Sequence, residues 1–330
     1  MIQQLGTCLT VVLATVAGFA LAAEDQPTYT DPALAGSDFA IQGEYLGEVA
    51  TDEGQVTYGV QVIARGQGKF DVVAYPGGLP GAKGDVSQKI HATGTTIDGV
   101  TTFVSADGRA TGTIRGSVLA IENANGEQLG SLKKVDRVSP SAKAKPPAGA
   151  TVLFDGSGTD HFVDGKMTEC GLLEVGTESK ERFQDFRLHL EFRSPFMPCS
   201  LGQARGNSGV YLQGRYEIQI LDSFGLEGRD NECGGIYKAA PPRVNMCLPP
   251  LSWQTYDIEF TAAKFDAEGK KTQNAKVTVL HNGVAIHENL ELPDVTPGGT
   301  LKTESTEPGP LFLQDHHNPV HFRNIWVVEK

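Results

Sequence analysis

Short runs in which hydrophobic and polar residues alternate fill most of this chain, and this is the pattern of half-buried β-strands. The clearest runs are residues 185–192 and 216–221, where apolar side chains occupy alternate positions. Turn sequences such as Asn282-Gly283 separate neighbouring runs. After the N-terminus no segment shows the periodicity of a long amphipathic helix. The pattern therefore predicts an all-β protein.

Residues 39–138 contain short strand-like segments separated by turn signals, among them Asp98-Gly99 and Asn125-Gly126. The spacing predicts a meander of hairpins that forms a small sandwich or roll. No catalytic constellation is recognisable in this half. We therefore expect an accessory β domain.

Residues 139–150 are dominated by Pro, Ala and Lys and contain nothing that favours burial, so we interpret them as a linker. The chain from 151 to 330 would then be a second, larger domain. It contains many strand-like runs joined by long irregular loops, which favours a two-sheet sandwich of the jelly-roll type.

Residues 1–22 have the features of a secretory signal peptide: a short apolar run from 9 to 21 and the cleavage-site sequence Ala20-Leu21-Ala22. The apolar run is shorter than the ~20 residues of a transmembrane helix. We therefore expect an exported protein, periplasmic or extracellular, with no stable membrane span after cleavage.

Composition narrows the choice of partner and compartment. The net charge of -12 argues against nucleic-acid binding. Four cysteines follow the leader, an even number that suggests disulfides in an exported protein. Three pairings are possible, and we favour Cys170–Cys199 with Cys233–Cys247 because each pair closes a local loop.

The stretch from 206 to 225, GNSGVYLQGRYEIQILDSFG, predicts two strands joined by a Gly-Arg turn. On the second strand Tyr216, Ile218 and Ile220 face one side, while Glu217 and Gln219 face the other. A carboxylate and an amide side by side suit the floor of a groove. The same alternation also fits an ordinary solvated outer face.

Several blocks of residues 151–330 resemble, in the same order, the 3-keto-disaccharide hydrolase family. The most specific are GNSGVYLQGRYEIQILDS and PLFLQDHHNPVHFRNIWV; the others are LFDG, DFRLHLEFR, GGIY, WQTYDIEF and HNGVAIHE. The resemblance implies a concanavalin A-like jelly roll that acts on an oligosaccharide or glycoside oxidised at C3. It does not extend to the N-terminal half.

The implied chemistry follows from the ketone, which acidifies the proton at C2. A base removes that proton, an enolate forms, the aglycone leaves C1 by β-elimination, and water adds to the enone. Such a site needs a base, a group that stabilises the enolate oxygen and an acid for the leaving oxygen.

Polar residues in the matched blocks are the candidates for these roles. We expect Glu217 or His316 as the base, with Asp315 beside it, and Arg323 or a bound divalent cation such as Ca²⁺ as the enolate stabiliser. Asp315 could instead form a structural turn, and Arg323 a structural salt bridge. Whether a metal is required stays open. Candidate sugar-binding residues are Asn207, Gln213, Gln219, Asp222, Tyr237 and Trp253.

Two other functions compete with this one. Laminarinase-type hydrolases share the fold and carry E-x-D-x-x-E on a strand, but here the middle acid is Gln219 and the last is Asp222. Because residues five apart on a strand face opposite ways, this departure disfavours a retaining mechanism. A non-catalytic lectin-like module is the second alternative. An enzyme, unlike a lectin, should hold a titratable group with a shifted pKa.

Overall fold

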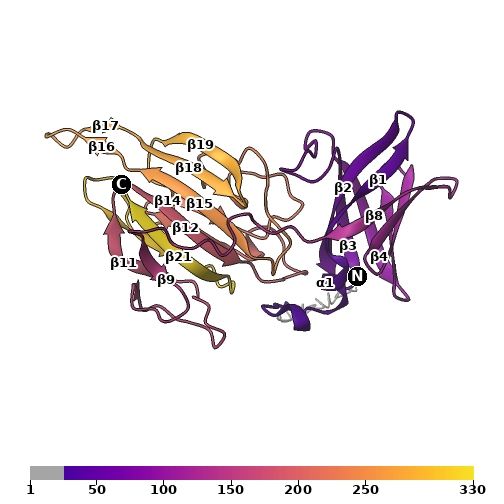
Figure 1. Cartoon of the computed structure of the whole chain (residues 1–330), viewed down its shortest axis with the longest axis horizontal. Coiled ribbons are helices and arrows are strands. Elements are labelled where there is room, and N and C mark those ends of the chain that lie inside the picture. The colour runs from indigo at the N-terminus through magenta and orange to yellow at the C-terminus, as the bar shows by residue number, and fades with distance from the viewer. Residues whose placement is uncertain (1–25) are drawn as a thin grey trace, which may run out of the picture.

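The computed structural model describes residues 26–330, so the predicted signal peptide lies outside the described residues. Two bodies built from strands make up the molecule, an N-terminal barrel and a C-terminal sandwich (Figure 1). The only helical elements in residues 26–330 are the 3-10 helices η1 (Pro32–Leu34) and η2 (Gly202–Ala204) and the short helix α1 (Gly36–Ile41). The prediction of an all-β protein is confirmed.

The N-terminal body is a closed antiparallel barrel in which each strand pairs with the next along the chain. The predicted meander is confirmed, but it closes on itself, because β1 also pairs with β8, with Glu44 opposite Val135. The strands are β1 (Gly43–Thr51), β2 (Gly54–Gly66), β3 (Lys69–Pro76), β4 (Ile90–Ile97), β5 (Val100–Ser105), β6 (Ala110–Arg115), β7 (Val118–Asn123) and β8 (Gln128–Val135).

The C-terminal body packs two antiparallel sheets around one core, consistent with the predicted jelly-roll sandwich. The five-stranded sheet has the order β10-β11-β20-β13-β14, and the six-stranded sheet the order β19-β18-β15-β12-β21-β9. Their strands are β9 (Thr151–Phe154), β10 (Phe162–Val163), β11 (Thr177–Phe183), β12 (Phe186–Arg193), β13 (Ser208–Leu212), β14 (Tyr216–Ile220), β15 (Gln254–Thr261), β18 (Ala275–His281), β19 (Val284–Leu292), β20 (Gly309–Leu313) and β21 (His321–Glu329); β16 (Lys264–Phe265) and β17 (Lys271–Gln273) form a separate pair.

The barrel is packed against the sandwich through the outer faces of β2 and β3. Ile63, Val73 and Tyr75 point away from the barrel interior and belong to the hydrophobic core of the sandwich. The buried guanidinium of Arg205, from the sandwich, donates to the backbone carbonyl of Ala64 in β2. The shared core therefore joins the two bodies.

The segment predicted to be an unburied linker lies along the outer face of the six-stranded sheet. Ser139 is buried and shares a hydrogen bond of 2.6 Å with Thr255, and Ser141 donates to Asp257 over 2.5 Å. The backbone N–H of Lys143 donates to the buried carboxylate of Glu191. The expectation that nothing in this segment is buried was wrong, because its small polar residues satisfy polar groups that the strands present outward.

Candidate functional site

The hairpin of β13 and β14 carries the candidate site. Gln213 (φ 53) and Gly214 (φ 61) turn the chain with left-handed backbone angles, and this turn sets Tyr211 opposite Glu217. Alternate residues of both strands, Val210 and Ile218 among them, enter the core of the sandwich. The side chains of Tyr211 and Glu217 consequently lie on the outer face of the five-stranded sheet.

Glu217 is buried on that outer face, with only 3% of its surface exposed. The Tyr211 hydroxyl lies 2.8 Å from its Oε2. The Gln219 side-chain amide lies 2.7 Å from its Oε1, and we orient the amide nitrogen toward the carboxylate so that a donor faces an acceptor. No cationic side chain in residues 26–330 forms a salt bridge with Glu217. The carboxyl is therefore held by neutral groups.

Burial is the main cause of an altered pKa at this carboxyl. Removal from water disfavours the charged form and raises the pKa of Glu217 to about 7, although the hydrogen bond from Tyr211 opposes the increase. A carboxyl with this pKa holds and releases a proton with equal ease near neutral pH, which is the property of an efficient general base.

The hydrogen bonds of the Tyr211 hydroxyl also indicate that Glu217 can be either protonated or ionised. Its single hydroxyl proton faces two acceptors, Glu217 at 2.8 Å and the carbonyl of Pro297 at 2.7 Å. When Tyr211 donates to ionised Glu217, the Pro297 carbonyl loses its donor. When Tyr211 donates to Pro297, the short contact with Glu217 requires the carboxyl to carry the proton. The hydrogen bonds therefore accommodate both protonation states of Glu217.

Two glycines leave room for these side chains. A Cβ at Gly209 on β13 would lie 2.4 Å from Glu217 Oε1, and one at Gly298 (φ +92) would lie 2.3 Å from the Tyr211 hydroxyl oxygen. Both distances are far below van der Waals contact, so any side chain at either position would displace the pair. This steric requirement accounts for the second glycine of the GNSG block, Gly209.

Gln314, directly after β20, completes the polar group. Its side-chain nitrogen donates to the Tyr211 hydroxyl over 3.2 Å, while its Oε1 is buried without a hydrogen-bond partner in the described chain. A buried acceptor of this kind is costly unless something donates to it. The oxygen is therefore an acceptor that no donor in the described chain satisfies.

A row of amides connects Glu217 with the protein surface. The far end of the Gln219 amide lies 3.0 Å from the side chain of Gln203, which is exposed. Asn207 Nδ2 donates to the backbone carbonyl of Gln203 over 2.8 Å. Three predicted site residues, Glu217, Gln219 and Asn207, are thus brought together. Tyr237 lies beside the same strand, because its neighbour Ile236 forms a bridge with Ile218 of β14.

The loop that carries Asp315 and His316 is fastened beside β13. The N–H of Gln314 donates to Gly209, and the N–H of Asn207 donates to Asn318 Oδ1. Asp315 accepts a hydrogen bond of 2.6 Å from the N–H of His317, so it forms the structural turn considered as its alternative role. His316 is exposed on this turn. Neither residue forms a hydrogen bond with Glu217 in the described chain.

Arg323 does not join this group. It lies on β21 in the other sheet, where its guanidinium donates to Glu191 over 2.7 and 2.8 Å and covers the Trp253 ring at 3.9 Å. Both sheets bury their inner faces in one core, so their outer faces point in opposite directions. The expected partnership of Arg323 with Glu217 was wrong for this reason, and Trp253 lies on the same remote face.

Glu191 is a second buried carboxyl with the opposite electrostatics. Burial alone would raise its pKa, but hydrogen bonds from His189, Asn324, Arg323 and the Lys143 N–H outweigh this effect and lower the pKa to about 2. This carboxylate stays ionised at neutral pH and anchors the segment that crosses the sheet. Its role is structural.

Two further candidates have structural partners. Asp222 forms a buried ion pair with Arg205 at 2.6 Å. Gln213 donates to the Phe183 carbonyl and accepts from Arg215, which fixes the hairpin turn. Neither side chain is directed to Glu217 by these contacts.

The four described cysteines are all free, so the structure contains neither predicted disulfide. Cys170 is exposed on a turn, whereas Cys199 packs against the barrel, where a Cβ at Gly66 would lie 2.4 Å from its sulfur. Cys233 and Cys247 are both buried; the Cys233 thiol lies 3.3 Å from the Tyr256 hydroxyl, and the Cys247 thiol donates to the Leu221 carbonyl over 3.5 Å. Closing a local loop in sequence was not sufficient to predict a bond.

Metal ligands are dispersed in the described chain. Within residues 26–330 no group of three or more His, Cys, Asp or Glu side chains is placed to hold a metal ion. At the candidate site Glu217 supplies one carboxylate, and its neighbours are amides and a phenol.

Sequence reasoning missed Tyr211 and Gln314 as partners of Glu217. If the residues on either side of the predicted turn are paired across the two strands, Tyr211 lies opposite Glu217, as the structure shows. Alternation along PLFLQ would have directed Gln314 to the outer face, since Leu311 and Leu313 enter the core.

Comparisons with known proteins assign the sandwich to a family. The family described as "3-keto-alpha-glucoside-1,2-lyase-like domain" matches residues 149–328. A crystal structure from Parabacteroides distasonis, described as a "putative glycosyl hydrolase", is 32% identical, with a TM-score of 0.51 over 56% of this chain and 85% of that chain. A second structure with that description and source is 18% identical, with a TM-score of 0.42 over 59% of this chain and 98% of that chain. Among curated proteins, none matches.

Proposed function

Because this chain belongs to the 3-keto-alpha-glucoside-1,2-lyase-like family, we propose that it cleaves the glycosidic bond of a 3-keto-glycoside or 3-keto-disaccharide. Cleavage would proceed by proton abstraction at C2, β-elimination and hydration. The residues that carry this reaction are those on the outer face of β13 and β14.

Glu217 is the base in this proposal. Its ionised carboxylate takes the proton from C2, and the electrons of the C–H bond form the enolate C2=C3–O⁻. The enolate collapses to restore the ketone and form the C1=C2 bond, and the aglycone oxygen leaves C1. The proton held by Glu217 is then available to that oxygen. Water adds its hydroxyl to C1 and a proton to C2.

Neutral hydrogen-bond donors are the proposed stabilisers of the enolate oxygen. The Tyr211 hydroxyl and the Gln219 amide both lie within 2.8 Å of the Glu217 carboxylate, on the face where the substrate would enter. Both donors bind the ionised carboxylate before the reaction, and protonation of Glu217 would release them to the enolate oxygen, where positioned donors lower the energy of the developing charge. Gln314 Oε1 and Asn207 would position sugar hydroxyls.

The observation that carries the proposal is the buried carboxyl of Glu217, with its pKa of about 7 and no cationic partner in the described chain. A structural carboxylate would be paired, as Glu191 is with Arg323. A lectin has no need of such a group, so the titratable pair favours an enzyme.

A retaining glycosidase is not favoured. That mechanism needs a second carboxylate about 5–5.5 Å from the first. Gln219 occupies the middle position of the motif, and Asp222 is neutralised by Arg205 in a buried ion pair. The strand therefore offers Glu217 alone.

The direct test compares a chromogenic 3-keto-glucoside, in both anomers, with its unoxidised parent. We expect cleavage of a keto substrate only, and its loss in Glu217→Gln. The matched control is Glu268→Gln, at an exposed turn far from the hairpin in sequence. Cleavage of the parent sugar, or full activity of Glu217→Gln, would contradict the mechanism. Binding of the keto sugar without turnover would support the lectin alternative.

Export to the periplasm or cell exterior is part of the proposal, because residues 1–22 have the features of a signal peptide. Residues 26–330 include no helix of the length and hydrophobicity that a membrane crossing requires. N-terminal sequencing of the protein from its native cells would test the proposed cleavage after Ala22.

A further inference from the structure

The interior of the N-terminal barrel is filled at one end only. At the end where β2 turns into β3, Tyr45 and Phe70 are buried together with Phe196 from the sandwich. Helix α1 covers this end, since Asp38 accepts a hydrogen bond from the N–H of Gly68 and Ile41 accepts one from the Tyr45 hydroxyl (Figure 1). A molecule could not enter from this side.

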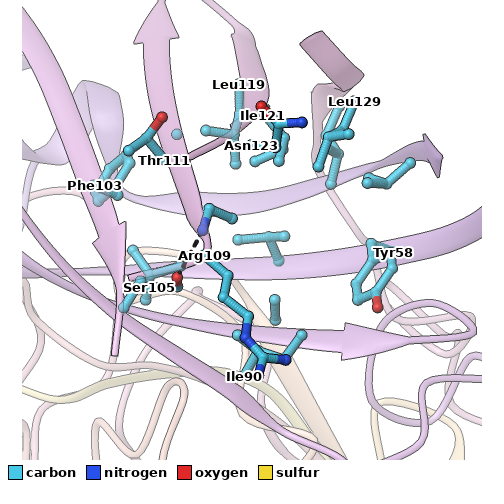
Figure 2. Close-up of a pocket in the computed structure, with 18 of the residues that line it drawn as sticks. Tyr58, Ile90, Phe103, Ser105, Arg109, Thr111, Leu119, Ile121, Asn123 and Leu129 are labelled. Carbon is cyan, nitrogen blue, oxygen red and sulfur yellow. Dashed lines mark hydrogen bonds between the residues drawn. The ribbon is translucent and has the colours of Figure 1, made fainter. Parts of the chain in front are cut away.

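The opposite half of the barrel is hollow. A cavity of about 610 Å³ opens between the turns β1–β2, β5–β6 and β7–β8 and the loop after β3 (Figure 2). Its wall is formed mainly by aliphatic and aromatic side chains from all eight strands. They include Tyr58, Ile90, Phe103, Leu119, Ile121 and Leu129.

Small residues create the space. The interior of an eight-stranded barrel is just wide enough for its side chains to fill, or to hold one small ligand. Here Ala74, Ala92, Ala110 and Gly112, from three different strands, line the hollow half. The volume falls within the range of 300–1,000 Å³ that is usual for small-molecule sites.

Most polar groups of the wall already have protein partners. Ser105 donates to Asp107 and accepts from the N–H of Ala110. Asn123 donates to Glu127 and accepts from its N–H. The hydroxyl of Tyr58 forms no hydrogen bond within the described chain, and it leaves one polar position for a ligand.

The mouth of the cavity carries no unpaired positive charge. Arg109 lies 3.6 Å from Asp107, and Asp52 adds a second carboxylate at the rim. An anionic ligand would meet a net negative rim on a chain whose net charge is -12. The rim therefore favours an uncharged ligand over a fatty-acid-like anion.

We propose that the barrel binds one uncharged, largely apolar small molecule in its open half. The driving force is the burial of apolar surface against the aliphatic and aromatic wall. The Tyr58 hydroxyl provides orientation. This binding is separate from the sugar chemistry of the sandwich.

The test uses the full chain and the neutral fluorescent probe N-phenyl-1-naphthylamine, with its anionic analogue 1-anilinonaphthalene-8-sulfonate for comparison. We expect saturable, one-to-one binding of the neutral probe and affinity for the anion lower by about tenfold or more. The Glu217→Gln variant should bind the probe unchanged, so this result does not depend on the proposed enzyme activity.

Variants with larger side chains inside the cavity test whether the probe binds there. Ala74→Phe should weaken neutral-probe binding by about tenfold, and Ala110→Leu, from another strand, gives a second and smaller filler if the first fails to fold. The matched control is Val104→Phe, since Val104 is 52% exposed on the outer face of β5. Equal binding by wild type and both fillers would overturn the proposal. Absence of saturable binding, or preference for the anion, would overturn it as well.

Discussion

The hydroxyl of Tyr211 and the carboxyl of Glu217 face each other across one hairpin, 2.8 Å apart and both buried. Burial raises the pKa of Tyr211, so its phenol stays protonated. A second proton enters or leaves at Glu217 near neutral pH. The candidate site is therefore a proton-exchanging pair rather than a fixed charge.

The rate should depend on pH through Glu217. Because the base must be ionised, we expect kcat/KM for the keto substrate to fall as pH decreases through about 7. In Tyr211→Phe the rate should decrease and the pKa should move higher, since the lost hydrogen bond had lowered it. Rate profiles between pH 5 and 9 measure both effects. A limb that stays in place in Tyr211→Phe would assign the titration to another group.

Gly209→Ala should abolish activity without unfolding the protein. The new methyl group would lie 2.4 Å from Glu217 Oε1 and 3.0 Å from Gln314 Oε1, so the carboxyl must leave its position. Gly158→Ala is the control, because a Cβ there meets no atom within 4 Å. Turnover and thermal melting of both variants test the prediction. Normal turnover by Gly209→Ala would show that the position of Glu217 is unimportant.

Glu217→Gln should make the protein more stable at alkaline pH. Folding raises the pKa of this carboxyl from 4.5 to about 7, so the folded state of the wild type loses stability as pH rises through that interval. At pH 8 the amide avoids this cost of about 3 kcal/mol. Below pH 4.5 the carboxyl is protonated in both states, and the gain should vanish.

Urea unfolding at pH 8 and pH 4 measures the difference in free energy of unfolding. The same gain at both pH values would mean that the substitution acts through packing and not through charge.

Arg323→Met should destabilise the fold and leave catalysis intact. The substitution removes the cationic partner of buried, ionised Glu191, and breaking a buried pair in this way costs about 3 kcal/mol. Exposed Arg187, on the neighbouring strand β12, gives the control Arg187→Met. The prediction is tested by measuring both the unfolding midpoint of Arg323→Met and the kcat of the folded variant. A large fall in kcat with unchanged stability would indicate instead that Arg323 takes part in catalysis.

The strands were accessible from sequence because alternation and turn residues are local signals. The hairpin of residues 208–220 and the order of the N-terminal meander both follow from neighbouring segments. Closure of the barrel could not be predicted from the sequence, because β1 and β8 are distant along the chain and a roll or a sandwich would contain the same strands. The cavity in the barrel exists only because of that closure.

The alternation of residues 216–221 was enough to place Glu217 and Gln219 on one strand face, and the motifs of residues 151–330 were enough to show their resemblance to one family of sugar-acting enzymes. Which polar residues come into contact depends on how the two sheets pack in three dimensions. Alternation fixes the face of a strand but not the direction in which its sheet faces, so Glu217 and Arg323 looked equally suited to one site. Packing of two sheets on one core put them on opposite sides. It also removed Glu217 from water, and that burial, which no local pattern encodes, gives the carboxyl its pKa.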